Sequence, residues 1–149
     1  RIGQAVARRA AAFGMDVRLV GRSDDLYMAL RVADVVSLHA PLTDETHHMI
    51  NADALSVMQP HAILVNTARG GLIDQAALRA ALRESRLAAA ALDVTDPEPL
   101  QPGDPLFDAP NLIVLPHIGS ATVTARERMA DLCVDDLVKA LADSSYMVL

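Results

Sequence analysis

Short apolar segments alternate with segments of helical periodicity along this chain, and that alternation limits the fold more than any other feature. Residues 62–67, 87–94 and 112–115 are nearly all apolar, which is typical of strands buried on both faces of a parallel sheet. The helical segments between them can serve as the crossovers that parallel strands need. The alternation therefore predicts an α/β fold whose parallel sheet is covered by helices on both faces.

The same patterns place the individual elements, with glycine and proline residues marking several of their ends. Gly14 is expected to cap the first helix at its C-terminus, and Asp74 to cap a central helix at its N-terminus. An apolar face of the last helix is expected at Met129, Leu132, Leu137 and Leu141. We expect strands at 17–20, 34–40, 62–67, 87–94 and 112–115, and helices at 2–13, 52–58, 74–86 and 122–142.

Composition narrows the class of protein. The 149 residues suit one domain, and with 52% hydrophobic but only 3% aromatic residues, small aliphatic side chains must fill the core. A net charge of −6 argues against a nucleic-acid surface, and no apolar run reaches the roughly 18–20 residues of a membrane span. The single Cys133, expected to be buried in the last helix, excludes an internal disulfide and fits a reducing compartment. These features favour a cytoplasmic location.

The first residues carry the remnant of a dinucleotide-binding pattern. Gly3 lies at the start of an Ala-rich helix and matches the last glycine of GxGxxG, where a small residue allows close helix–strand packing. The alternative is a glycine that serves packing alone. Because a helix pattern begins at residue 1, we expect the first strand and the other two glycines to precede Arg1.

The residues that would read the cofactor's ribose are expected about 20 positions further on, at the end of the second strand. Gly21, Arg22 and Ser23 occupy that position, and none of them is acidic. A guanidinium beside a hydroxyl suits a 2′-phosphate, although Asp24 and Asp25 would partly repel one. The pattern predicts NADP in preference to NAD, with a solvated turn as the alternative.

Three ionisable residues are expected near the ends of strands, where open α/β sheets bind ligands. Arg69 could hold a substrate carboxylate through two hydrogen bonds. His117 could donate a proton to a carbonyl if a carboxylate keeps it charged, and Glu98, between Pro97 and Pro99, is the candidate partner. Taken singly, they could equally be a surface arginine, a loop acid and a histidine bonded to backbone. Their joint placement favours a catalytic site.

The other histidines offer no metal site. His47 and His48 are adjacent, so their side chains diverge, and neither His39 nor His61 has a partner at metal-ligand spacing. No CxxC, HExxH or P-loop pattern occurs.

Four segments together resemble one family. They are DVVSLHAPLTDET (34–46), LVNTARGGLID (64–74), AAALDVTDPEPL (89–100) and LPHIGSAT (115–122). In this order they resemble the NAD(P)-binding domain of the D-isomer-specific 2-hydroxyacid dehydrogenases, over nearly the whole chain. Together with Gly21-Arg22, they are most similar to the glyoxylate/hydroxypyruvate reductase branch of that family.

The resemblance implies a role for each candidate. Arg69 would bind the substrate's carboxylate and carbonyl, while His117 would donate the proton with its pKa raised by Glu98. Asp93 would hold the nicotinamide carboxamide. The remaining implied cofactor contacts are Arg1 and Ile2 with the pyrophosphate, and Thr67, Ala68, Gly119 and Ser120 around the nicotinamide.

Two departures from the family pattern imply an incomplete domain. The substrate-binding domain, the first strand and most of the glycine loop are absent, and residues 23–33 are too few to hold the helix and third strand expected there. In the strand order 3-2-1-4-5-6 this removes a central strand and an edge strand. We therefore expect residues 1–149 to form a partial dinucleotide-binding domain with an incomplete, Rossmann-like, doubly wound sheet.

The resemblance implies an oxidoreductase that moves a hydride between NAD(P)H and a small 2-keto acid such as glyoxylate or hydroxypyruvate. The full-length enzyme is expected to be a homodimer that binds neither nucleic acid nor membranes. Two alternatives stay open: a non-enzymatic dinucleotide-sensing module like the corepressors that share this fold, and an inactive fragment.

Overall fold

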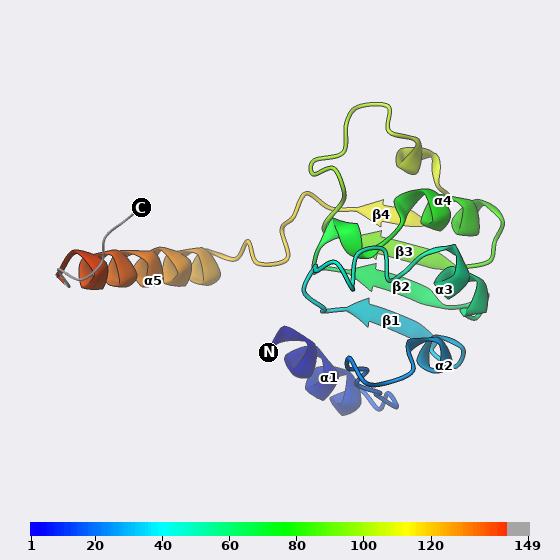
Figure 1. Ribbon diagram of the computed structural model, residues 1–149, viewed down its shortest axis with the longest axis horizontal. Helices are drawn as coiled ribbons and strands as arrows, with labels where there is room; N and C mark the ends of the chain where they lie inside the picture. Colours follow the sequence, from blue (N-terminus) through cyan, green and yellow to red (C-terminus); the bar gives the residue numbers. More distant parts are fainter. Residues whose placement is uncertain (143–149) are drawn as a thin grey trace. The chain divides into compact units, whose positions relative to one another are not determined.

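The computed structural model describes residues 1–142, which form two compact units divided after Pro116. The first unit, Arg1–Pro116, holds the sheet and all helices but one, and the second begins at His117 and holds the last helix. Figure 1 shows the elements of both and their labels.

A four-stranded parallel sheet forms the centre of the first unit (Figure 1). Its strands are β1 (Val35–Leu38), β2 (Ile63–Asn66), β3 (Ala89–Leu92) and β4 (Leu112–Val114), adjacent in chain order. The register pairs Ile63 with Val35 on one side and with Ala89 on the other. The predicted parallel α/β sheet is confirmed, and so are four of the five expected strands.

Most helices begin where a polar side chain accepts a hydrogen bond from a first-turn amide. Asp25, Asn51 and Asp74 accept in this way at the starts of α2, α3 and α4. Asp74 is therefore the predicted cap, and Gly14, with a φ of 82°, follows the end of α1 as expected. The helices are α1 (Ile2–Ala12), α2 (Leu26–Leu30), α3 (Ala52–Val57), α4 (Gln75–Arg83) and α5 (Val123–Ala142), with the 3-10 turns η1 (Gly70–Leu72) and η2 (Pro105–Asp108).

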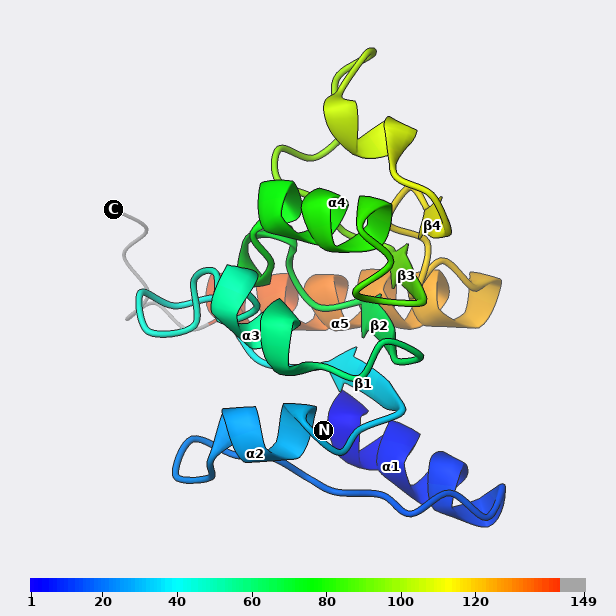
Figure 2. The ribbon, with the colours of Figure 1, turned by 90° about the vertical axis from the view of Figure 1, so that its right-hand side faces the viewer.

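The core lies between the sheet and the layer formed by α3 and α4, which pack side by side on one face (Figure 2). Leu64 and Leu92 point into this core from the sheet, and Leu55 and Leu78 from the helices. The opposite face is more open, because Val35, Ile63 and Ile113 are 44, 40 and 60% exposed. Helix cover was expected on both faces of the sheet, and extensive burial is seen on one.

The expected strand at residues 17–20 is wrong, because these residues pair with no strand. A strand requires a neighbour for its backbone groups, and within residues 1–142 the edge of β1 away from β2 carries none. Residues 23–33 were predicted to be too few for the family's third strand, and they hold a short helix, α2, instead. The sheet is thus a fragment of the Rossmann-like arrangement, as predicted.

Helix α5 has the expected length, but its side chains differ from the prediction. Met129, Leu132, Leu137 and Leu141 are 45, 52, 59 and 77% exposed. At about 100° per residue, Leu132 lies opposite Leu141 and Met129 about 120° from it, so the four spread over roughly half of the helix circumference. Cys133 is also exposed, which corrects the expectation that it is buried.

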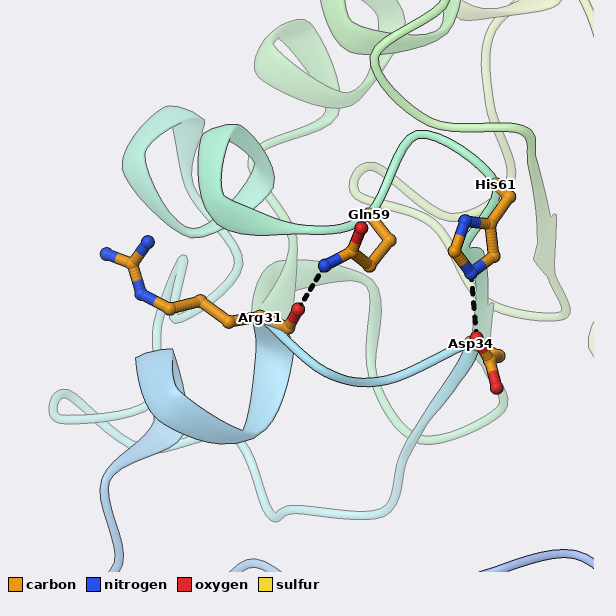
Figure 3. A network of polar contacts seen from close by, with 4 residues as sticks. All are labelled: Arg31, Asp34, Gln59 and His61. Carbon is orange, nitrogen blue, oxygen red and sulfur yellow. Dashed lines mark hydrogen bonds and ion pairs between the residues drawn. The ribbon is translucent and has the colours of Figure 1, made fainter.

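Side-chain hydrogen bonds join the connection between α2 and β1 to the connection between α3 and β2 (Figure 3). Gln59 donates its side-chain amide to the Arg31 carbonyl, and the His61 Nε2 lies 2.7 Å from the Asp34 Oδ1. Asp34 and His61 precede β1 and β2, so this contact lies at the amino ends of the strands. The candidate site residues follow the carboxyl ends of the strands, so they lie at the opposite end of the sheet from this contact.

Among the described residues, none of the helices is both long and apolar enough to cross a bilayer.

Candidate functional site

Polar residues follow the carboxyl end of each of the first three strands. His39 comes directly after β1, Thr67 after β2 and Asp93 after β3. Parallel strands end at the same edge of a sheet, so these residues come to one side of the molecule. This edge is where ligands bind in open α/β folds.

A cavity of about 690 Å³ opens at this edge. It is formed by the start of α1, the chain after β1 and the turn after β2. The structure therefore brings together four residues predicted from the sequence, Ile2, Thr67, Ala68 and Arg69. The other lining residues are His39, Ala40, Pro41 and Leu42.

The N-terminus of α1 reaches this cavity without a side-chain cap. Arg1 occupies the cap position and accepts no amide hydrogen bond through its side chain, and the first turn contains no acidic residue. The next three helices along the chain are each capped by Asp or Asn. A helix start with no acidic residue in its first turn is suited to an anion such as a pyrophosphate.

Gly3 packs directly against the residue that follows β1. A Cβ built on Gly3 would lie 3.1 Å from the His39 Cβ and 3.2 Å from its Cγ. That spacing is tighter than ordinary van der Waals contact, so a side chain here would require His39 or the helix to shift slightly. Gly3 therefore lies close to the chain that follows β1, and its role as the last glycine of GxGxxG stays a prediction.

The buried side-chain amide of Asn66 stabilises the turn that carries Arg69. Asn66 is fully buried at the end of β2, where its Nδ2 donates to the Arg69 carbonyl at 2.9 Å. Its Oδ1 accepts from the Ala68 amide at 3.0 Å. A buried amide with these partners fixes the turn, while the Arg69 side chain is exposed and its Nη1 donates to the Ala68 carbonyl at 2.6 Å.

The loop after β3 carries Asp93 and Glu98 in contrasting environments. Asp93 is 4% exposed, and its backbone amide donates to the Asn66 carbonyl at 2.9 Å. Glu98 is exposed, within an exposed run of residues 96–99. This loop passes so close to η1 that a Cβ on Gly70 would lie 2.0 Å from the Thr95 carbonyl oxygen.

The second unit begins with the predicted proton donor. His117 has a φ of 53°, in the left-handed region that non-glycine residues seldom adopt. Gly119 and Ser120, predicted to border the nicotinamide, follow it and are exposed. His48, Ser85 and Asn111 have similar angles, so this angle does not by itself mark a functional residue.

The predicted ribose-reading turn does not line the cavity. Gly21, Arg22 and Ser23 are exposed, and the Asp24 Oδ2 accepts from the Gly21 amide at 2.7 Å. The carboxylate therefore lies within the turn that was expected to hold a phosphate. Asp25 caps α2 and accepts from Met28 at 3.0 Å.

Sequence reasoning set His39 aside, yet it lines the cavity beside Arg69. Its Nε2 lies 2.9 Å from the Ser37 Oγ, and burial lowers the pKa of the imidazole. The signal that could have identified His39 is its position immediately after an apolar strand, like that of Thr67. Asn66 was also missed, although a polar residue at the end of an apolar strand is a similar signal.

No cluster of three or more potential metal ligands is found within residues 1–142. The set at the cavity is instead a cation, an imidazole and an uncapped helix start, which suits an anionic organic ligand.

The sequence profile described as "D-isomer specific 2-hydroxyacid dehydrogenase, NAD binding domain" matches residues 1–119. The chain belongs to this family. The predicted resemblance is thereby confirmed, and the four-stranded sheet is a fragment of the NAD-binding domain of these dehydrogenases.

Individual dehydrogenases of the family are similar over most of this chain. Glyoxylate reductase of Thermococcus litoralis is 44% identical over 151 residues, which cover 93% of this chain and 45% of the relative. The chain thus spans about half the length of the curated relatives it matches.

Two solved structures share the fold and differ in their cofactor. An NADPH-dependent glyoxylate/hydroxypyruvate reductase from Sinorhizobium meliloti, in complex with NADP and malonate, has a TM-score of 0.84 at 36% identity over 99% of this chain and 49% of its own. A D-lactate dehydrogenase from Aquifex aeolicus, complexed with NAD and lactic acid, has a TM-score of 0.84 at 33% identity over 95% of this chain and 50% of its own.

Proposed function

We propose that this chain is the dinucleotide-binding part of an oxidoreductase that interconverts a small 2-keto acid and its 2-hydroxy acid. The observation that carries the proposal is the cavity that brings Arg69 together with the start of α1, beside Thr67 and Ala68. Membership of the dehydrogenase family supports it, as do the names of the relatives. Glyoxylate and hydroxypyruvate are the proposed substrates.

The residues of the first unit fit a nicotinamide dinucleotide. The open amides at the start of α1, at Ile2 and Gly3, would receive the pyrophosphate beside Arg1. Thr67 and Ala68 on the cavity wall would border the nicotinamide, and the buried Asp93 would accept from its carboxamide. The family resemblance gives Gly119 and Ser120, in the second unit, the same proposed role. When bound, the nicotinamide supplies or accepts the hydride.

Three residues are proposed to act on the substrate. The Arg69 guanidinium would pair with the substrate carboxylate and polarise the keto group, because a planar fork matches a carboxylate. His117 would protonate the carbonyl oxygen as the alcohol forms. Glu98 would favour the imidazolium form of His117, which is the form that reduction requires.

We propose that NADP is preferred and that NAD can be used. Arg22 and Ser23 provide the cation and hydroxyl that suit a 2′-phosphate. The Asp24 carboxylate on the Gly21 amide opposes this preference, since it places a negative charge in the same turn. Relatives of both kinds are known, one in complex with NADP and one with NAD.

The wider setting is proposed from the family. Residues 1–149 would be a partial dinucleotide-binding domain that works with a substrate-binding domain, in a cytoplasmic homodimer that contacts neither nucleic acid nor membranes. The net charge of −6 supports the absence of a nucleic-acid partner.

A chimera tests the activity directly. In it, this chain replaces the matching segment of Thermococcus litoralis glyoxylate reductase, and NADPH oxidation by glyoxylate is followed by absorbance. The chain alone is assayed in parallel, and binding of NADPH is measured for both. We expect turnover by the chimera at a rate that rises with glyoxylate concentration.

The alternatives give different results. A chimera that binds NADPH but never turns over, although it is folded, would contradict the enzyme and favour a dinucleotide-sensing module. A folded chimera that binds no dinucleotide would indicate an inactive fragment.

A further inference from the structure

Gln75 is the first residue of α4, and its side chain reaches the loop after β3. The Gln75 Nε2 donates to the Asp96 carbonyl at 2.6 Å, and the Gln75 Oε1 accepts from the Asp96 amide at 2.9 Å. One side chain therefore binds both backbone groups of a residue that lies two positions before Glu98.

The contact is not needed to build the helix. Asp74 already caps α4 by accepting from the Ala77 amide at 3.0 Å. A glutamine at the first position of a helix is usually solvated, whereas this one spans 21 residues of sequence to reach its partner. The geometry is that of a clamp on the loop rather than of a helix cap.

Other contacts restrain the same segment against η1. A Cβ on Gly71 would lie 3.4 Å from the Asp96 Oδ2, and Gly70 contacts the backbone of Thr95 and Asp96. The Thr95 Oγ1 donates to the Pro97 carbonyl at 2.9 Å. Because Pro97 and Pro99 fix φ on either side of Glu98, the path of the chain at Asp96 determines where Glu98 is presented.

We propose that Gln75 is a positioning residue for the reaction, which holds the Glu98 loop in a fixed place beside the turn that carries Arg69. This inference rests on the proposed function, because it requires Glu98 to act in proton transfer. A misplacement of about 1 Å at a reacting group can cost roughly a hundredfold in rate, so a clamp outside the site can control turnover.

The test uses Gln75→Leu, which keeps the volume and removes both hydrogen bonds, in the chimera with the relative's remaining segments. We expect kcat for glyoxylate reduction to fall by roughly ten- to a hundredfold. KM should change little, since Arg69 and its turn are retained. The alkaline limb of the kcat–pH profile should move to lower pH, because a displaced Glu98 stabilises the imidazolium less.

Gln75→Leu removes no charged group, so the charged residues of this loop and of the turn beside it, among them Arg69, Asp93 and Asp96, are all retained. A movement of the pH limb therefore reports the position of Glu98. A double-mutant cycle with Glu98→Gln sharpens this, since Gln75→Leu should have little further effect once the carboxylate is gone.

The matched control is Gln101→Leu in the same loop, where the Gln101 Nε2 lies 3.4 Å from the Pro99 carbonyl. It should leave kcat and the pH limb unchanged. If Gln75→Leu does not fold, Gln75→Glu replaces it, because an acid is favourable at a helix start but opposes the Asp96 carbonyl.

The results separate the two proposals. No turnover by the unmodified chimera sinks the proposed function itself. With turnover present, an unmoved pH limb or additive effects of the Gln75 and Glu98 changes would overturn the positioning role.

Discussion

Gly70 lies against Thr95 so closely that a Cβ on the glycine would come within 2.0 Å of the threonine's carbonyl oxygen. The atoms on both sides are backbone, so neither side can yield by changing rotamer. This approach joins the loop that carries Glu98 to the turn that carries Arg69. The geometry of the proposed site therefore depends on a residue that has no side chain.

We expect Gly70→Ala to destabilise the chain by about 3 kcal/mol or more, because the new methyl group must displace buried backbone. The free energy of unfolding can be measured with denaturant. Gly21→Ala is the control, since a Cβ there would meet its nearest atom at 3.4 Å, an ordinary contact. Equal losses for both variants would refute the close approach.

Arg69→Lys should lower kcat/KM for glyoxylate by roughly ten- to a hundredfold in the chimera. Lysine keeps the charge but loses the planar pair of donors, and a hydrogen bond to a charged group contributes about 1.5–3 kcal/mol. Steady-state kinetics measure the change. Arg86→Lys provides the control, because Arg86 forms an ion pair with Glu84, two residues before it, at 2.8 Å.

His117→Ala should abolish reduction while NADPH still binds. Removing a general acid typically costs about 10²–10⁴-fold in rate, whereas the proposed pyrophosphate site at α1 is untouched. Turnover and the fluorescence of bound NADPH are read on the same preparation. Activity at the original level would remove the proton-donor assignment.

Substitutions of Arg22 and Asp24 should change the preference for NADPH over NADH in opposite directions. Arg22→Ala is expected to weaken NADPH binding by about tenfold relative to NADH, and Asp24→Asn to strengthen it, since like charges disfavour each other. Titration of each variant with both nucleotides gives the ratio. Tighter binding of NADH than NADPH to the unmodified protein would argue against the role of Arg22.

His39 should make stability depend on pH. Burial lowers its pKa in the folded state, so the unfolded chain takes up the proton first as the pH falls through its ordinary value of 6.5. Stability is then present above that pH and is lost below it. Denaturant unfolding between about pH 7 and pH 5 should show a shallower loss for His39→Asn than for the unmodified chain or for His47→Asn.

The sequence predicted those parts of the fold that depend on local chemistry. Asp74 caps α4 as expected, and the four strands that pair are the apolar runs that precede polar turns. Residues 17–20 were predicted as a strand because they have the right composition, but pairing depends on a neighbour that no local pattern reports. The predicted burial of Cys133 was wrong for a similar reason, because helical periodicity does not show which other element covers a helix.

The site was predictable to the extent that it follows strand ends. Arg69 was found from its place after an apolar strand, whereas Ile2, Thr67 and Ala68, which also line the cavity, came from the family resemblance. Gln75 could not be found in this way, because its partner lies 21 residues away and nothing in either segment marks the pairing. Asp24 was predicted to repel a 2′-phosphate, but its hydrogen bond with the Gly21 amide is visible only in the structure.

The sheet also has a kinetic consequence. Its strands are neighbours in chain order, yet all pairs are parallel, so every pairing must wait for a crossover over residues 39–62, 67–88 or 93–111 to close. The paired strands include no hairpin that could start the sheet locally. A chain of this kind is expected to refold slowly for its size, and to expose β1 and β4 to wrong partners while it does so.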